Sequence, residues 1–393
     1  MSEAGPGDGD DAPHGLEAIG EHALAELGRR ERAASWVGHR VDLVVRRVLR
    51  ALFARRGLPM MNRHELERSL AMLRCYNAPE ILADPDRLLA PPRELPRVHE
   101  RWRRRIRGGT HAHLEFDTPY VPVHPIYAAE YRRYDRIDRA HLFAWQHKQR
   151  APASLLITHG WGLGVKAVHE LEFGIPWLFG ALGLDVYYWV APFHWIRKPS
   201  RARFSGELHP SPNLMRTNEA FVQSVIELRT AIGLIKAHNP APLGMMGSSL
   251  GGYTTALLSS IDDRLSFCAP ILPPSSLADL FWEHGSADPM RHEAESMGMT
   301  KDRFREAWSL HSPMSYRPKV PWEGRLIASA AGDALVGEHH VDVLWRHWDR
   351  PRRVRFGGGH ILQVYRGQYQ RELARMLGRL GVIDSTKLRR LKL

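Results

Sequence analysis

The chain has 393 residues, of which 44% are hydrophobic, and a formal net charge of +12 at pH 7. This size allows one large core, in one elaborated domain or two. Two cysteines far apart, Cys75 and Cys268, support neither a disulfide framework nor a paired-cysteine zinc site and fit a reducing, cytoplasmic setting. No stretch reaches the roughly 18 consecutive apolar residues of a membrane-spanning helix.

The first part of the chain differs from the rest in composition and in residue pattern. Residues 1–14 are acidic and Gly-rich and lack the start of a secretory signal, so we expect a disordered acidic tail. A helical pattern follows from residue 15 to about 57, with apolar residues at three- and four-residue spacing: Val41, Val44, Val45, Val48, Leu49 and Leu52. Residues 58–108 predict short helices and loops rather than sheet. We assign residues 15–108 to a helical N-terminal extension.

Much of the positive charge lies in this extension. The arginines form two groups: Arg46, Arg47, Arg50, Arg55 and Arg56, then Arg101, Arg103, Arg104, Arg105 and Arg107. Solvated helix faces are the ordinary interpretation, because charge runs usually bind no ligand. The alternative is a site for anionic lipid or nucleic acid. Of these partners we expect peripheral contact with the inner membrane surface rather than nucleic acid, and the oligomeric state stays open.

From residue 109 to 393 the pattern predicts a single α/β catalytic domain. Residues from His111 onward alternate apolar and polar, which is typical of an antiparallel entry hairpin. Short apolar runs then alternate with helical segments, in this order: SLLITHG, a helix around 167–182, LDVYYWVAP, a helix from about 218 to 238, PLGMMG, a helix at 250–259, SFCAPILP, an irregular stretch to about 321, RLIASAAGD, a helix near 337–348, RRVRFGGGH and a last long helix. This alternation predicts a mostly parallel sheet covered on both faces by helices, with functional groups at the carboxyl ends of its strands.

One motif carries a candidate nucleophile. Residues Gly247 to Gly251 fit the pattern G-x-S-x-G, with a predicted strand directly before the motif and a helix directly after it. Such a turn holds its central serine in a strained conformation, and the flanking glycines let the backbone approach closely. Ser249 occupies the central position. A five-residue motif occurs by chance in many chains. Whether Ser249 is a nucleophile therefore depends on whether the sequence also supplies a base and an acid for it.

A serine hydroxyl needs a base within hydrogen-bond reach, and the base needs an orienting group. In this arrangement the chain order is serine, acid, histidine. Asp333, in AAGDALVG, and His360, in FGGGHILQ, meet that order at the ends of two predicted strands. Taken singly, Asp333 could be a turn or cap residue and His360 a histidine of a Gly-rich turn. Lesser candidates for the base are four other histidines: His159, His194, His339 and His340.

An acyl-transfer site also needs two N–H donors for the oxyanion. We expect one from Leu250, directly after the nucleophile, and one from the turn His159-Gly160-Trp161-Gly162. Trp161 is the first choice and Gly162 the alternative, with Gly160 and Gly162 also expected to contact substrate. The simpler interpretation is a Gly-rich turn between a strand and a helix.

Through HGWG, GSSLGG, AAGD and GGGH, residues from about 111 to 380 resemble the α/β-hydrolase superfamily, in its serine esterase or lipase-like members. The resemblance implies the α/β-hydrolase fold and a Ser-His-Asp triad. More narrowly, PLGMMGSSLGGY, VDLVVRRVL and APFHWIRKPSRARFSGE are similar to the α/β-hydrolase domain-containing protein 18-like group. The HGWG turn departs from the pattern of the eukaryotic members of that group, which leaves the substrate open.

Residues 275–320 interrupt the strand pattern and predict a small lid insertion. Its apolar residues are Leu277, Leu280, Phe281, Trp282, Met290, Met297, Met299, Phe304 and Trp308. Such residues can line an adaptable pocket, although packing of helices onto the body is the commoner role. We select Phe281 and Trp282 as candidate substrate contacts. Basic residues near 197–203 are expected as solvated loop charge, or as charge near the mouth of the site.

The sequence contains no metal-ligand spacing, P-loop or dinucleotide fingerprint, so we expect neither a metal nor a cofactor. The predicted function is a serine hydrolase that cleaves a carboxylic ester, with a small-molecule or lipid ester that carries an apolar acyl group as substrate. The alternatives are a thioesterase or an amidase or peptidase with the same triad, and a noncatalytic binding protein of the same fold.

Overall fold

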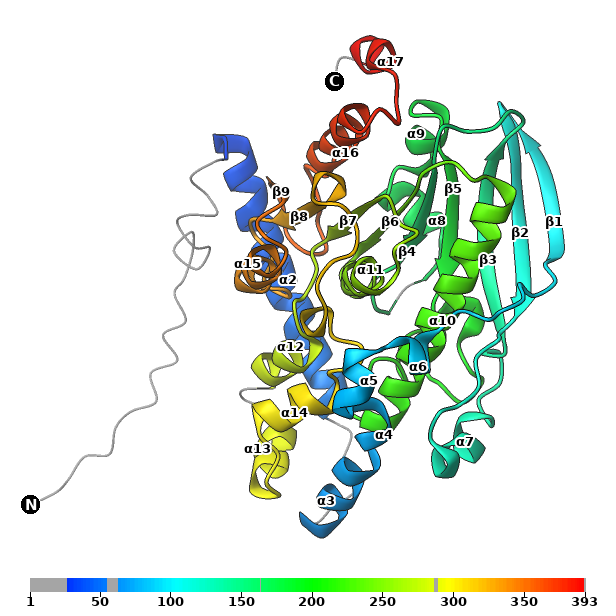
Figure 1. Cartoon of the computed structure of the whole chain (residues 1–393). Coiled ribbons are helices and arrows are strands. Elements are labelled where there is room, and N and C mark those ends of the chain that lie inside the picture. Colours follow the sequence, from blue (N-terminus) through cyan, green and yellow to red (C-terminus); the bar gives the residue numbers. More distant parts are fainter. Residues whose placement is uncertain (1–26, 55–62, 163, 286–288, 392–393) are drawn as a thin grey trace, which may run out of the picture.

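The computed structural model describes residues 27–54, 63–162, 164–285 and 289–391 (Figure 1). The predicted acidic tail, residues 1–14, lies outside the described residues. None of the described helices is long and apolar enough to cross a bilayer.

A nine-stranded sheet runs through the molecule, in the order β1-β2-β3-β5-β4-β6-β7-β8-β9. The strands are β1 (His99–Ile106), β2 (Gly109–Asp117), β3 (Arg139–His147), β4 (Ser154–Thr158), β5 (Asp185–Val190), β6 (Leu243–Ser248), β7 (Phe267–Ile271), β8 (Leu326–Ala330) and β9 (Arg352–Phe356). The pairs β1–β2, β2–β3 and β3–β5 are antiparallel. All pairs from β5 to β9 in the sheet order are parallel. The predicted mostly parallel sheet with an antiparallel entry hairpin is confirmed.

Helices cover both faces of this sheet, as expected. The helices of the described residues are α2 (Arg29–Ala54), α3 (Arg63–Met72), α4 (Arg74–Asn77), α5 (Pro79–Ala83), α6 (Asp86–Leu89), α7 (Pro125–Tyr131), α8 (Lys166–Glu172), α9 (Ile175–Gly180), α10 (Leu214–His238), α11 (Leu250–Ile261), α12 (Leu277–His284), α13 (Pro289–Ser296), α14 (Lys301–Ala307), α15 (Glu338–His347), α16 (Gly367–Arg379) and α17 (Ser385–Arg390).

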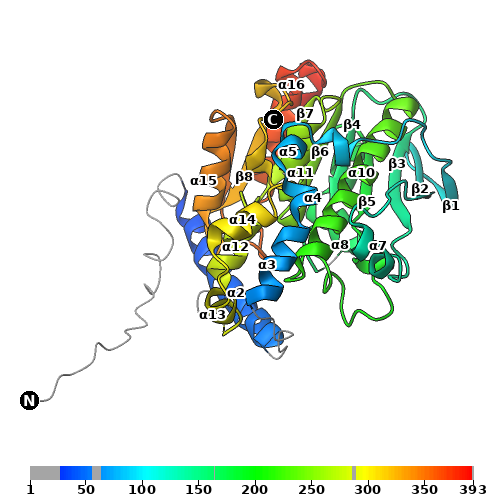
Figure 2. The same ribbon diagram turned by 60° about the horizontal axis from the view of Figure 1, so that its bottom comes forward.

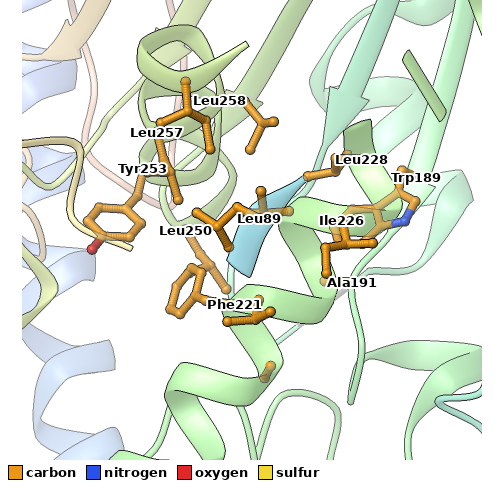
Figure 3. Packing of buried hydrophobic residues seen from close by; sticks show 14 of the residues in the cluster. Leu89, Trp189, Ala191, Phe221, Ile226, Leu228, Leu250, Tyr253, Leu257 and Leu258 are labelled. Atoms are coloured by element: carbon orange, nitrogen blue, oxygen red, sulfur yellow. The ribbon is translucent and has the colours of Figure 1, made fainter. Parts of the chain in front are cut away.

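Alternate residues of the buried strands point to opposite faces of the sheet and pack into two separate hydrophobic cores. In β4, Leu156 packs with the side chains of α10 and α11, whereas Leu155 and Ile157 pack with those of α9 and α16. This is the alternation that a strand buried on both faces requires. Figure 3 shows the first core, where Phe221 of α10 lies beside α11 and its ring centroid is 5.6 Å from that of Tyr253.

The expectation of no sheet before residue 108 is wrong. Strand β1 pairs with β2 over His99–Ile106 and forms one edge of the sheet. The proposed division at residue 108 therefore falls inside the β1–β2 hairpin. Whether residues 15–108 and 109–393 behave as separate units stays a prediction.

The region expected as an irregular lid is helical. It contains α12, α13 and α14, which lie between β7 and β8 in the chain and on the same side of the molecule as α2 (Figure 2). Helix α2 itself runs past the end of the sheet formed by β8 and β9, beside α15 (Figure 1). The earliest described helix of the chain thus lies next to its last two strands.

Candidate active site

Ser249 lies on a sharp turn between β6 and α11. Its backbone angles are φ 57° and ψ −116°, a region that a residue with a side chain rarely adopts. A Cβ atom on Gly251 would overlap the carbonyl oxygen of Thr158, and one on Gly247 would overlap the carbonyl oxygen of Gly251. The glycines of the motif are therefore required by close packing of backbone on backbone, as G-x-S-x-G predicts.

The structure brings Ser249, His360 and Asp333 together. The Nε2 atom of His360 lies 2.9 Å from Oγ of Ser249, and its Nδ1 atom lies 2.7 Å from Oδ2 of Asp333. Asp333 follows β8 and His360 follows β9, so three loops at the carboxyl ends of parallel strands supply the three side chains. A carboxylate only accepts hydrogen bonds, so Nδ1 carries the proton and Nε2 is left to accept the serine hydroxyl.

Charges around His360 favour its protonated form. Burial alone would lower the pKa of the imidazole, but the charge and hydrogen bond of Asp333 and the charges of Asp42 and Glu172 outweigh burial and raise the pKa above the usual 6.5. The second oxygen of Asp333 accepts the N–H groups of Leu335 and Val336 at 2.9 and 2.7 Å. These bonds fix the carboxylate toward His360.

The other candidate histidines have structural partners. Both ring nitrogens of His159 are engaged, Nδ1 at 2.8 Å from the carbonyl of Gly160 and Nε2 accepting the N–H of Ala191 at 3.0 Å. His194 is buried, and burial lowers its pKa to about 4. His339 and His340 lie in the first turn of α15, as expected, where each pairs with Glu283.

The predicted oxyanion donors lie around the serine. Leu250 is the first residue of α11, so its N–H has no acceptor within the helix. Across from it, a Cβ atom placed on Gly160 would lie 3.4 Å from Cβ of Ser249, so the HGWG turn lies against Ser249. The indole of Trp161 donates to the carbonyl of Gly206 at 2.8 Å, and Gly162 has φ 86°. Loop 204–206 thereby supports this turn.

Phe281 and Trp282, selected as substrate contacts, make their described contacts within the insertion. Phe281 packs edge-on against Trp308, with ring centroids 5.5 Å apart, and the guanidinium of Arg291 lies over the ring of Trp282. A direct contact with substrate stays a prediction for both.

Arg197 fits neither expectation for the basic residues of its loop, which were solvated charge or charge near the mouth of the site. It is fully buried and forms two hydrogen bonds to the Glu227 carboxylate, at 2.6 and 2.8 Å, and two more to the carbonyls of Val190 and Ile137. The residue therefore ties the loop after β5 to α10 and is neither solvated nor available at the mouth of the site.

Sequence reasoning missed Asp42 of α2. Its carboxylate is buried against the two loops that carry Asp333 and His360. A signal was available in the sequence, because Ser35, Gly38 and Asp42 recur at three- and four-residue spacing on one face of a helix that is otherwise rich in valine and arginine.

Among the residues that the structure describes, two groups of donor side chains lie close enough together to hold a cation, although the sequence shows no ligand spacing. They are His113, Glu115 and His141, and Glu283, His339 and His340. In the first group Arg101 and Arg139 pair with the carboxylate, and in the second Lys301 does. Ion pairing with these basic residues accounts for both carboxylates.

No family model matches the chain. It is 28% identical over 358 residues to the uncharacterized protein Rv2627c of Mycobacterium tuberculosis, which covers 87% of this chain and 82% of that protein. Among solved structures, acetyl xylan esterase 1 from a Thermoanaerobacterium strain has a TM-score of 0.55 at 14% identity, over 78% of this chain and 97% of that one. An acetyl xylan esterase from a Paenibacillus strain has a TM-score of 0.53 at 12% identity, over 79% and 98%.

These structural likenesses, with the strand order and the turn at Ser249, show that the chain has the α/β-hydrolase fold. The predicted fold is confirmed. The narrower resemblance to the α/β-hydrolase domain-containing protein 18-like group stays a prediction.

Proposed function

We propose that the protein is a serine hydrolase that cleaves carboxylic esters, with Ser249 as nucleophile, His360 as general base and Asp333 as the group that orients the histidine. The observation that carries this proposal is the continuous hydrogen-bonded chain from Oγ of Ser249 through His360 to Asp333, at 2.9 and 2.7 Å. Two such short contacts from three separate loops match the geometry that activates a serine hydroxyl.

In the first half of the reaction, Oγ of Ser249 attacks the ester carbonyl carbon while Nε2 of His360 takes the hydroxyl proton. The carbonyl oxygen becomes an oxyanion, for which the N–H groups of Leu250 and Trp161, or Gly162 in place of Trp161, are the proposed donors. Collapse of this intermediate breaks the bond to the leaving alkoxide, which receives the proton from Nε2. The acyl group is then held as an ester of Ser249.

In the second half, water attacks the acyl carbon and gives a proton to Nε2 of His360. The second intermediate collapses with release of the carboxylic acid, and the proton returns from Nε2 to Oγ of Ser249. Asp333 keeps its charge throughout and stabilises the imidazolium that forms twice in the cycle.

Apolar acyl esters are the substrate class that the surroundings of His360 favour. Ile361, Leu362 and Val364 lie within the four residues after it and are exposed. Leu171 of α8 is also exposed, one residue before Glu172, which accepts a hydrogen bond from Gln363. Exposed apolar side chains gathered beside a reactive centre are a suitable surface for an acyl chain. The two solved neighbours are named acetyl xylan esterases, so short acyl esters belong in the same trial.

The test is a panel of chromogenic esters with acyl chains from acetyl to long-chain, with thioester and amide analogues of each. We expect hydrolysis of the esters and a preference that rises with the apolar area of the acyl group. Ser249→Ala should lose activity on every substrate, while Ser248→Ala, a change at the adjacent buried serine, should retain it. A purified wild-type protein that cleaves no member of the panel would contradict the proposal, and faster cleavage of thioesters or amides would move the substrate class to those bonds.

A second proposal concerns a partner surface on α2. The face of α2 opposite to Ser35, Gly38 and Asp42 exposes a stripe of apolar and basic residues: Trp36, Val37, Arg40, Val44, Arg47 and Val48. Apolar side chains interleaved with arginines are the composition of a helix that lies on an anionic membrane surface. We propose that this stripe makes a peripheral contact with such a membrane and brings the site to lipid esters.

Vesicle flotation tests this contact. Full-length protein should float with phosphatidylserine vesicles and not with neutral phosphatidylcholine vesicles, and added salt should weaken the binding because the arginines contribute by charge. The double change Arg40→Gln and Arg47→Gln should reduce binding, whereas the matched change Arg103→Gln and Arg105→Gln on β1 should not. Equal flotation with both lipids, or none with either, would overturn the proposal.

A further inference from the structure

A buried carboxylate from α2 joins the two loops that carry the acid and the base. Oδ2 of Asp42 accepts the N–H of His360 at 2.7 Å and that of Ala334 at 3.1 Å, and Oδ1 accepts the N–H of Ile361 at 3.1 Å. Ala334 directly follows Asp333. One side chain therefore binds the backbone beside the acid and the backbone of the base itself.

Helix α2 packs against these two loops with backbone in direct contact with backbone. A Cβ atom on Gly38 would overlap the backbone nitrogen of Gly359, and one on Gly332 would overlap the carbonyl oxygen of Ser35. Oγ of Ser35 also accepts the N–H of Gly358 at 3.2 Å. Backbone of the helix thus touches backbone of both loops within the two turns before Asp42, which leaves no room for the helix to move closer to them.

Asp42 occupies a place that is unfavourable for a charge. Its side chain is fully buried, and burial and the nearby charge of Asp333 raise its pKa above the usual value, although His360 and the donated N–H groups act in the opposite direction. A buried carboxylate is unfavourable unless it is hydrogen-bonded, and a second negative charge nearby makes it more so. An apolar or amide side chain would remove the charge repulsion. A carboxylate at this position is explained if its oxygen atoms hold the two neighbouring loops by hydrogen bonds and its charge acts on His360.

We propose that Asp42 is a positioning residue for the reaction, which sets the His360 loop relative to the Asp333 loop and so keeps Nε2 in reach of Ser249. This inference rests on the proposed hydrolase function. It makes α2, which comes before the whole sheet in the chain, a part of the active-site support. Misplacement of a reacting group by about 1 Å can cost on the order of 100-fold in rate, so loss of this support is measurable.

The charge of Asp42 has a second, distinguishable effect. The carboxylates that face His360 are Asp333 from the loop after β8, Asp42 from α2 and Glu172 from α8, and each favours the imidazolium. Removal of one negative charge lowers the pKa of His360. Because the unprotonated imidazole is the base, the rising limb of the pH–rate profile should then move to lower pH.

The experiment compares the wild type with Asp42→Asn, which keeps the shape but replaces one acceptor oxygen by a donor. We expect kcat to fall by about 10- to 100-fold with a much smaller change in KM, and the rising limb of the profile to move to lower pH. Ala33→Asn, an exposed change on the same helix outside the named stripe, should leave kcat and the profile as in the wild type. A helix that only stabilises the fold would change the melting temperature without moving the profile.

The outcomes separate the two proposals. A wild-type protein inactive on the whole ester panel removes the hydrolase function and this inference with it. An active wild type whose Asp42→Asn variant keeps kcat within about twofold and the same profile overturns the role of Asp42 alone. If Asp42→Asn does not fold, Asp42→Ser, which leaves room for water at the three N–H groups, carries the same expectations. Hydrogen exchange of the wild type gives an independent check, since the amides of Ala334, His360 and Ile361 must be protected, and rapid exchange of all three would also overturn the inference.

Discussion

Asp333 and His360 meet at 2.7 Å although each sits on a different loop, and this contact determines which nitrogen of the imidazole bears the proton. Asp333→Asn keeps the size of the side chain but offers an N–H toward Nδ1, which favours the tautomer that cannot accept from Ser249. We expect kcat to fall by about 10⁴-fold with little change in KM. Steady-state kinetics on the best ester of the panel provide the measurement, and a loss of less than about tenfold would contradict the assigned role of Asp333.

The pH dependence of the reaction follows from the sign of the shift at His360. Burial opposes protonation, but Asp333, Asp42 and Glu172 together raise the pKa of His360 above its usual value of 6.5. The proposed base acts only when unprotonated, so kcat/KM should rise with pH and reach half of its plateau above pH 6.5. A profile of the wild type on an activated ester gives this value directly. A half-maximal point below pH 6.5 would contradict the balance of charges described around the histidine.

Two glycines in helices offer a matched test of the turn at Ser249. Gly251→Ala places a Cβ atom onto the carbonyl oxygen of Thr158, so the turn or β4 must move, and we expect a loss of about 1–3 kcal/mol in the free energy of unfolding together with most of the activity. Gly180→Ala in α9 meets no atom within 4 Å and should be neutral or slightly stabilising. Urea unfolding of both variants checks the pair, and equal stabilities would show that the close approach at Gly251 is not constraining.

The buried pair of Arg197 and Glu227 predicts a large stability effect at a distance from the chemistry. Arg197→Met leaves the Glu227 carboxylate buried without its partner, and such changes typically cost about 3–5 kcal/mol. Arg203→Ala, which removes an exposed arginine paired with Glu207, should cost no more than about 1 kcal/mol. Denaturant unfolding measures both. A small effect at Arg197 would mean that water reaches the carboxylate in the variant.

Much of the fold was predictable because the buried strands are short apolar runs and the helices between them are periodic. Strand β1 was not, since HERWRRRI contains few apolar residues and lies at the sheet edge, exposed along most of its length. Its pairing with β2 makes it a strand, and no pattern within its own residues predicts that pairing.

The candidate site also contains residues that the sequence predicted and residues that it did not. Ser249, Asp333 and His360 each lie in a local motif at the end of a strand, and parallel strands bring such ends to one edge. Asp42 and Arg197 carry no local motif, because their importance comes from partners 318 and 30 residues away in the chain. An aspartate or arginine considered alone is most often solvated. The spacing of Ser35, Gly38 and Asp42 indicates one face of a helix, but only tertiary packing shows which groups Asp42 and Arg197 bind.

The most direct test of the central claim is the reaction of the purified protein with a fluorophosphonate probe, followed by mapping of the labelled peptide. Activation of Ser249 by His360 predicts about one label per chain, located on Ser249, with labelling lost in Ser249→Ala and strongly slowed in Asp333→Asn. A folded wild-type protein that takes up no label, or a label found on a different serine, would contradict the proposed nucleophile and the hydrolase function built on it.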